Sequence, residues 1–145
     1  MRVAVAGAGA FGRNHLRVYR ELEQASEGVQ LVAALEPNVE RAAEITSKYG
    51  IPVFATAAAL LAADLKLDAA SVAVPTVHHH AVACELLSAG VDLLVEKPLA
   101  ASLDQADQII ALAERHGRIV QVGHLERFNP AVAAVEPRLR RPMFF

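Results

Sequence analysis

The chain has 145 residues, of which 54% are hydrophobic and 21% charged, and its formal net charge is −2. This composition fits one globular domain, and the small net charge leaves no basic footprint for binding nucleic acid or an anionic membrane surface. The lone cysteine, Cys84, fits a reducing compartment, and no apolar run approaches the ~20 residues that span a bilayer, so we expect a cytoplasmic protein.

Short β-branched runs alternate with longer amphipathic runs along the chain, a pattern typical of a parallel sheet with helices on both faces. In the first half we predict strand 2–6, helix 10–22, strand 29–35, helix 38–49, strand 51–54 and helix 56–63. Gly50 is the expected end of the helix over 38–49. The apolar stripe expected to pack the first helix on the sheet consists of Phe11, His15, Val18, Tyr19 and Leu22.

The second half continues the alternation. We predict strand 69–74, helix 78–88, strand 91–95, helix 102–116 and strand 118–122. Ser102 and Gln105 have the spacing of a capping box, and Gly117 is the expected helix end. Six strands joined by right-handed crossovers predict an α/β Rossmann fold, a doubly wound parallel sheet in three α/β/α layers with strand order 3-2-1-4-5-6.

The C-terminal region departs from this pattern, so we assign residues 1–123 to the Rossmann domain and treat 124–145 separately. Residues 130–141 have a helical pattern that contains Pro137, and residues 143–145 resemble the beginning of a strand. An exposed apolar strand edge promotes aggregation. We therefore interpret 124–145 as a linker and the truncated start of a C-terminal α+β domain that is absent from this chain.

The loop after the first predicted strand carries the motif G-x-G-x-x-G, from Gly7 to Gly12. Gly7 permits a tight turn, Gly9 lets the backbone approach a pyrophosphate, and Gly12 lets the helix pack closely on the strand. The helix N-terminus adds free N–H groups and positive potential for an anion. We expect the dinucleotide to contact Gly7, Gly9, Ala10, Phe11 and Gly12.

Glu36 is the last residue of the second predicted strand. A carboxylate there can accept hydrogen bonds from an adenosine ribose and would repel a 2′-phosphate. Positions 37–40 hold no arginine, although Arg41 can reach back. We therefore predict dinucleotide binding with NAD preferred over NADP; the alternative is that Glu36 is a solvated strand end.

Polar residues also follow the fourth, fifth and sixth predicted strands, whose carboxyl ends share one edge of the sheet. The segments are Pro75 to His80, Glu96-Lys97-Pro98, and Gly123 to Pro130. Consecutive histidines at a helix start point in different directions, so we expect no metal ion on His78, His79 and His80. His78 and His80 are expected to be solvated, and His15 and Cys84 to belong to the core.

With these motifs in this order, the chain resembles the glucose–fructose oxidoreductase/inositol dehydrogenase (Gfo/Idh/MocA) family over almost its whole length. The matching features are the glycine motif followed by His15, Pro75-Thr76 with His79, Glu96-Lys97-Pro98, and the run from Gly123 to Pro130. That last run is most similar to the family members that act on nucleotide sugars, such as UDP-N-acetylglucosamine 3-dehydrogenases.

The resemblance implies an NAD(P)-dependent oxidoreductase that oxidises a secondary alcohol of a sugar, cyclitol or nucleotide sugar by hydride transfer. It implies that Lys97 is the catalytic residue, bonded to the reacting oxygen, with Pro98 behind a cis bond that fixes the direction of the amine. It further implies cofactor contacts from Pro75, Thr76, His79 and Glu96, with Glu96 near the nicotinamide ribose. The alternative for Lys97 is a surface lysine before a turn.

His124, Arg127 and Asn129 are expected to border the substrate pocket; the alternative for His124 and Arg127 is a structural link between domains. In the family a second domain carries the sugar site with an Asp and a His, and the parent enzyme is expected to be a homo-oligomer. We therefore expect this chain to bind dinucleotide without oxidising a sugar.

Two other functions stay open. The parent can be a non-catalytic dinucleotide-sensing regulator of the same family, although a sensor does not need the amine of Lys97. It can also be another Rossmann reductase, such as dihydrodipicolinate reductase or homoserine dehydrogenase, which the Glu96-Lys97-Pro98 motif disfavours. The sugar and the redox direction are left open by the sequence.

Overall fold

Six parallel strands form the centre of the fold in the computed structural model, which describes residues 1–138. The strand order is β3-β2-β1-β4-β5-β6, so the predicted doubly wound topology is confirmed. Strand order reverses between β1 and β4, which places the crevice between their carboxyl ends. The strands are β1 (Arg2–Ala6), β2 (Gln30–Leu35), β3 (Val53–Phe54), β4 (Ala69–Val72), β5 (Asp92–Val95) and β6 (Val120–Val122).

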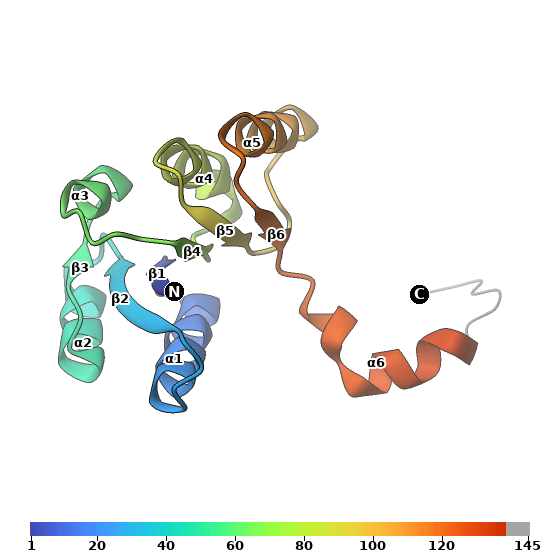
Figure 1. The fold of residues 1–145 in the computed structure, drawn as a ribbon, viewed down its shortest axis with the longest axis horizontal. Coiled ribbons are helices and arrows are strands. Elements are labelled where there is room, and N and C mark those ends of the chain that lie inside the picture. The colour runs from blue at the N-terminus through green and yellow to red at the C-terminus, as the bar shows by residue number, and fades with distance from the viewer. Residues whose placement is uncertain (139–145) are drawn as a thin grey trace.

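Helices cover both faces of the sheet, with α1 and α2 on one side and α3, α4 and α5 on the other (Figure 1). Each face has its own core: Leu16 and Ile45 pack with Val3 and Val5, whereas Ala4 and Ala6 face the opposite cluster. This alternation follows from the two-residue period of a strand. The helices are α1 (Ala10–Gln24), α2 (Val39–Tyr49), α3 (Ala57–Ala62), α4 (His79–Ser88) and α5 (Leu103–His116).

The predicted helix ends are set by local hydrogen bonds. Asn38 caps α2 by accepting a hydrogen bond from the Arg41 backbone N–H at 2.9 Å, and Ser102 caps α5 through the Gln105 N–H at 3.3 Å. Gly50 and Gly117 take the left-handed conformation at the C-caps, with φ of 65° and 60°. These caps confirm the boundaries expected from the residue types.

Several strands are shorter than predicted. β3 begins at Val53 rather than residue 51, because Pro52 has no N–H for the sheet ladder. β4 ends at Val72 rather than residue 74. Its neighbour β1 ends at Ala6, and the chain then turns at Gly7, so the ladder stops after the bond from the Ala73 N–H to the Ala6 oxygen at 2.7 Å.

The predicted apolar stripe of α1 is partly wrong. Phe11 and Val18 are exposed, and the buried residues of the helix are Gly12 and Leu16. The helix packs on the sheet through Gly12 and Leu16, each one position after a residue of the predicted stripe. Gly12 allows this close contact with the sheet backbone, but a glycine is not counted as apolar in a hydrophobic pattern.

Beyond β6, a 3-10 turn (Leu125–Phe128) leads to the short helix α6 (Pro130–Val135), which lies away from the sheet (Figure 1). The helix predicted over 130–141 is shorter, because a 3-10 turn (Glu136–Arg138) follows Val135. The end of that prediction and the strand predicted at 143–145 lie outside the described residues. Within residues 1–138, no helix combines the length and apolar character needed to cross a bilayer. The boundary at residue 123 stays a prediction.

Candidate functional site

The loop between β1 and α1 brings three glycines into different surroundings. Gly7 has a φ of +90°, and a Cβ on it would lie 2.7 Å from the backbone nitrogen of Val74. A Cβ on Gly12 would lie 1.8 Å from the carbonyl oxygen of Gly7. A Cβ on Gly9 would meet no atom within 4 Å. Gly7 and Gly12 are therefore required by backbone packing, whereas Gly9 leaves open space in front of the helix.

The N-terminus of α1 faces this open space without a side-chain cap. The helix begins at Ala10, and its N-cap is Gly9, which has no side chain to accept a hydrogen bond. The first backbone N–H groups of a helix have no acceptor within the helix, and they lie at the positive end of its dipole. This end of α1 can therefore bind an anionic group such as a phosphate.

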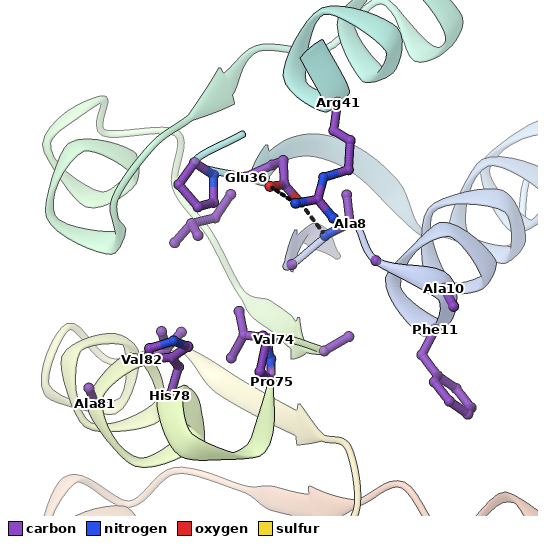
Figure 2. A pocket seen from close by; sticks show the side chains of 15 residues that line it. Ala8, Ala10, Phe11, Glu36, Arg41, Val74, Pro75, His78, Ala81 and Val82 are labelled. Carbon is purple, nitrogen blue, oxygen red and sulfur yellow. Dashed lines mark hydrogen bonds and ion pairs between the residues drawn. The ribbon is translucent and has the colours of Figure 1, made fainter. Parts of the chain in front are cut away.

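Glu36 is buried at the carboxyl end of β2, with 5% of its surface exposed. One carboxylate oxygen accepts a hydrogen bond from the Ala8 N–H at 3.0 Å, and the other accepts one from the Asn38 N–H at 2.9 Å. The guanidinium of Arg41 lies 3.5 Å from the same carboxylate (Figure 2). The alternative that Glu36 is a solvated strand end is therefore wrong: the carboxylate joins β2 to the glycine loop.

A cavity of about 560 Å³ opens beside this carboxylate, between the glycine loop and the start of α4 (Figure 2). Its lining is mostly apolar apart from Glu36, Arg41 and His78, so it can accept a flat, largely apolar ring. The wall opposite Glu36 contains Val74, Ala81 and Val82, which the sequence did not single out (Figure 2). Six of the predicted cofactor residues line the cavity: Gly7, Gly9, Ala10, Phe11, Glu36 and Pro75.

The other predicted cofactor residues lie outside that lining. Gly12 supports the loop from behind, and Thr76 begins a 3-10 turn (Thr76–His78) after β4. Glu96 and Lys97 follow β5, the next strand beyond β4 in the sheet. They therefore belong to the neighbouring half of the crevice rather than to the cavity itself.

His79 is buried between two backbone carbonyl groups, with 1% of its surface exposed. Its Nδ1 lies 2.9 Å from the Pro98 oxygen, and its Nε2 lies 2.9 Å from the Val74 oxygen. A neutral imidazole can donate to only one of them, so both contacts are hydrogen bonds only when the ring is protonated. His79 thus ties the segment after β4 to the turn after β5, and its neighbour His78 lines the cavity instead.

His80 bonds away from this site, because its Nε2 lies 2.7 Å from the Gln108 side chain on α5. The three histidines therefore point to three different surroundings. In the part of the chain that the structure describes, no three His, Cys, Asp or Glu side chains lie together as metal ligands would.

Lys97 and Glu96 lie beside the glycine loop, at the end of β5. The Lys97 side chain is exposed, and its amine lies 5.5 Å from the centre of the Phe11 ring. The Lys97–Pro98 peptide bond is cis, as the sequence led us to expect. Glu96 is buried, and its carboxylate lies 3.0 Å from Nε2 of His15. His15, expected to belong to the core, is half-buried on α1, and this contact joins residues 81 positions apart.

The three residues expected at the substrate pocket lie on the segment after β6. His124 and Arg127 are exposed, and neither lines the cavity. The Asn129 side chain caps α6, since its oxygen accepts a hydrogen bond from the Ala131 N–H at 3.0 Å. Cys84, which we expected to belong to the core, is half-buried on α4, and burial raises the pKa of its thiol.

Comparison with known proteins identifies a family that the chain matches. The GFO_IDH_MocA family model, described as an oxidoreductase family with an NAD-binding Rossmann fold, matches residues 1–124. The chain is 36% identical over 132 residues to UDP-N-acetylglucosamine 3-dehydrogenase of Acidithiobacillus ferrooxidans, covering 91% of this chain and 39% of that protein. It is 33% identical over 132 residues to inositol 2-dehydrogenase of Corynebacterium glutamicum, covering 90% and 38%.

The fold agrees with a solved structure of the first relative. The A. ferrooxidans enzyme superposes with a TM-score of 0.82 at 34% identity, covering 95% of this chain and 43% of that one. The chain thus spans about two fifths of the length of the curated relatives it matches.

Proposed function

The chain belongs to the Gfo/Idh/MocA oxidoreductase family and is an NAD(P)-binding Rossmann domain, and from this premise we propose that it is the cofactor-binding part of a dehydrogenase. The proposed reaction oxidises a secondary alcohol of a sugar, cyclitol or nucleotide sugar, with loss of the hydroxyl proton as hydride leaves the carbon. When bound, NAD supplies the hydride acceptor. The observation that carries the proposal is the buried Glu36 carboxylate beside an open glycine loop.

The cavity beside Glu36 fits the adenosine half of a dinucleotide. In a doubly wound sheet, an acidic residue at the end of β2 binds the ribose hydroxyls. The hydrogen bonds from Ala8 and Asn38 hold the Glu36 carboxylate in one orientation while it can still accept further bonds. The apolar wall formed by Val74, Ala81 and Val82 suits the face of an adenine ring.

The open space at Gly9 fits the pyrophosphate. The free N–H groups at the start of α1 can donate to phosphate oxygens, and the missing side chain at Gly9 permits close approach. Both features lie on the wall of the cavity that holds Gly9 and Ala10, and Phe11 beside them faces the Lys97 amine at the end of β5, where the second half of a dinucleotide would extend.

We assign the catalytic role to Lys97, as the family resemblance implies. Its amine can hydrogen-bond the alcohol oxygen and stabilise the negative charge that develops there as the proton leaves. Its position next to Phe11 supports this role, because it brings the amine to the loop that would hold the cofactor. His124 and Arg127 remain candidates for contacts with the substrate.

We infer a preference for NAD over NADP. A 2′-phosphate would approach the buried, charged Glu36, and placing two anions together in a poorly solvated site is unfavourable. Arg41 already lies against that carboxylate, at 3.5 Å, so part of its charge is neutralised by Glu36 rather than free for a phosphate.

The similarity to a UDP-N-acetylglucosamine dehydrogenase and an inositol dehydrogenase supports a polyhydroxylated substrate for the whole protein. Within residues 1–138, no carboxylate forms an ion pair with the Lys97 amine. We therefore propose that turnover requires acid–base groups from a second domain. The family resemblance further leads us to propose that the parent protein is a homo-oligomer.

Calorimetric titration of the chain with NAD and with NADP tests the proposal. We expect NAD to bind more tightly, and Glu36→Gln to weaken NAD binding by about tenfold while reducing the preference over NADP. Glu114→Gln, which removes the same charge from the exposed surface of α5, is the control and is expected to change neither affinity. Binding of neither nucleotide, or an unchanged preference in Glu36→Gln, would contradict the proposal.

A further inference from the structure

A chain of four polar side chains runs beneath the crevice, from α1 through β4 to the end of β5. Tyr19 Oη lies 2.7 Å from Ser71 Oγ, which lies 3.1 Å from His15 Nδ1. His15 Nε2 in turn lies 3.0 Å from Glu96 Oε1. Ser71 and Glu96 are buried, and His15 and Tyr19 are half-buried. The contacts connect residues from three separate elements of the sheet and helix layer.

The chemistry of the groups fixes the donor at the Glu96 end. An ionised carboxylate only accepts hydrogen bonds, so the Nε2–H of His15 donates to Glu96. In a neutral ring, Nδ1 then accepts from the Ser71 hydroxyl, and that hydroxyl accepts from Tyr19. Every member has a partner in this arrangement: Ser71, held by Tyr19, fixes the plane of the His15 ring, and Glu96 fixes its Nε2–H tautomer.

The Glu96 carboxylate retains unused accepting capacity. Its Oε2 receives one long hydrogen bond, 3.3 Å from the Lys97 backbone N–H, and no other from residues 1–138. A carboxylate has about four acceptor sites, and 6% of the Glu96 surface is exposed. Gly123 packs against it so closely that a Cβ there would lie 3.2 Å from both oxygens. The carboxylate is therefore held from behind, with capacity left for a ligand.

The family resemblance implies that Glu96 lies near the nicotinamide ribose, the second ribose of the cofactor. We propose that His15 is a positioning residue which, held by Ser71 and Tyr19, orients the Glu96 carboxylate to accept a hydrogen bond from a hydroxyl of that ribose. The proposal rests on the dinucleotide-binding function proposed above. Glu36 serves the adenosine ribose at the end of β2, and Glu96 has the corresponding location at the end of β5, on the opposite side of the strand-order reversal.

Two substitutions separate the two contacts of His15. Glutamine carries its amide nitrogen near the location of Nε2, so His15→Gln keeps a donor for Glu96. Asparagine is shorter and carries its amide near the location of Nδ1, so His15→Asn keeps the contact with Ser71 and loses the one with Glu96. Both variants are polar and uncharged, which makes each the control for the other.

Titration calorimetry of the chain and both variants would use three ligands: NAD, ADP-ribose and ADP. ADP lacks the second ribose, whereas ADP-ribose has it and lacks only the nicotinamide. We expect His15→Asn to weaken NAD and ADP-ribose by roughly tenfold, the loss of one hydrogen bond to a charged group, and to leave ADP unchanged. His15→Gln is expected to stay within about threefold of the unsubstituted chain for all three ligands.

Equal losses for all three ligands, or equal behaviour of the two variants, would overturn the positioning role and leave a structural one. If the unsubstituted chain binds none of the ligands, the proposed function itself fails, so the two failures are distinguishable. Should His15→Asn not fold, imidazole NMR of the unsubstituted chain decides: we expect a protonated Nε2 whose signal moves with ADP-ribose and not with ADP. A ring protonated only on Nδ1, or unmoved by ADP-ribose, would overturn the proposal.

Discussion

Two glycines of the loop between β1 and α1 have different physical tasks, and alanine substitutions separate them. A methyl group on Gly12 would collide with the Gly7 carbonyl oxygen at 1.8 Å, whereas a methyl group on Gly9 would meet open space. We expect Gly12→Ala to lower the free energy of unfolding by several kcal/mol, on the order of an overpacked core, and Gly9→Ala to leave it nearly unchanged.

The same pair differs in binding. Gly9→Ala is expected to weaken NAD binding at least tenfold while the chain stays folded, because the methyl group occupies the space that the pyrophosphate needs. Urea unfolding and calorimetry on both variants check the two expectations together. A stable Gly9→Ala variant with unchanged NAD affinity would show that the open space is not the phosphate site.

Cys84 gives a second test at single-residue resolution, because it is the one cysteine of the chain. Burial raises the pKa of its thiol, so the fraction of reactive thiolate at mildly alkaline pH is lower than in an unfolded chain. We expect iodoacetamide to label the folded protein several-fold more slowly than the urea-unfolded protein at the same pH. Equal rates would mean that the thiol is freely accessible.

Among the larger elements, the segment after β4 and the turn after β5 depend on His79. The ring lies 2.9 Å from both the Val74 and the Pro98 carbonyl oxygens and donates to at least one of them, so His79→Phe keeps a ring of similar size and removes the donor. We expect a loss of about 2–4 kcal/mol in the free energy of unfolding, measured by urea titration. His80→Phe, which removes a bond to Gln108, is expected to cost less than about 1 kcal/mol. Similar losses for both variants would contradict this assignment.

The bounds of an element were predictable where neighbouring residues in the sequence determine them. They were less predictable where contacts with distant parts of the backbone determine them. Asn38 and Gly50 identify the ends of α2 from residue type alone. The end of β4 depends on where the neighbouring strand β1 stops, so β4 was predicted too long. The buried face of α1 was misjudged because Gly12, a residue without a side chain, lies at its centre.

The same distinction holds for the site. Gly7, Glu36 and Lys97 carry motifs that can be read along the chain, and the fold brings them to one edge of the sheet. The contact between His15 and Glu96 joins two elements far apart in sequence, and no local pattern indicates it. The contact of His79 with the Pro98 oxygen likewise joins segments that follow different strands, and no local pattern indicates it.

At the scale of the whole molecule, we expect this chain to bind the cofactor without catalysing the reaction. Mixing this chain with NAD and UDP-N-acetylglucosamine or an inositol is expected to give no rise in NADH absorbance, because Lys97 has no acid–base partner in the described part of the chain. Sustained NADH formation, absent in Lys97→Ala, would mean that this domain completes the reaction by itself.

The most direct test of the central claim, that a nicotinamide dinucleotide lies across the crevice between β2 and β5, is NMR titration of the isotope-labelled chain with NAD. We expect saturable shifts of the backbone amide signals of Ala8, Ala10 and Phe11 on the loop, and of Lys97 at the end of β5, with no change on the outer surface of α5 around Glu114. Shifts confined to other surfaces, or no saturable shift at all, would contradict the account.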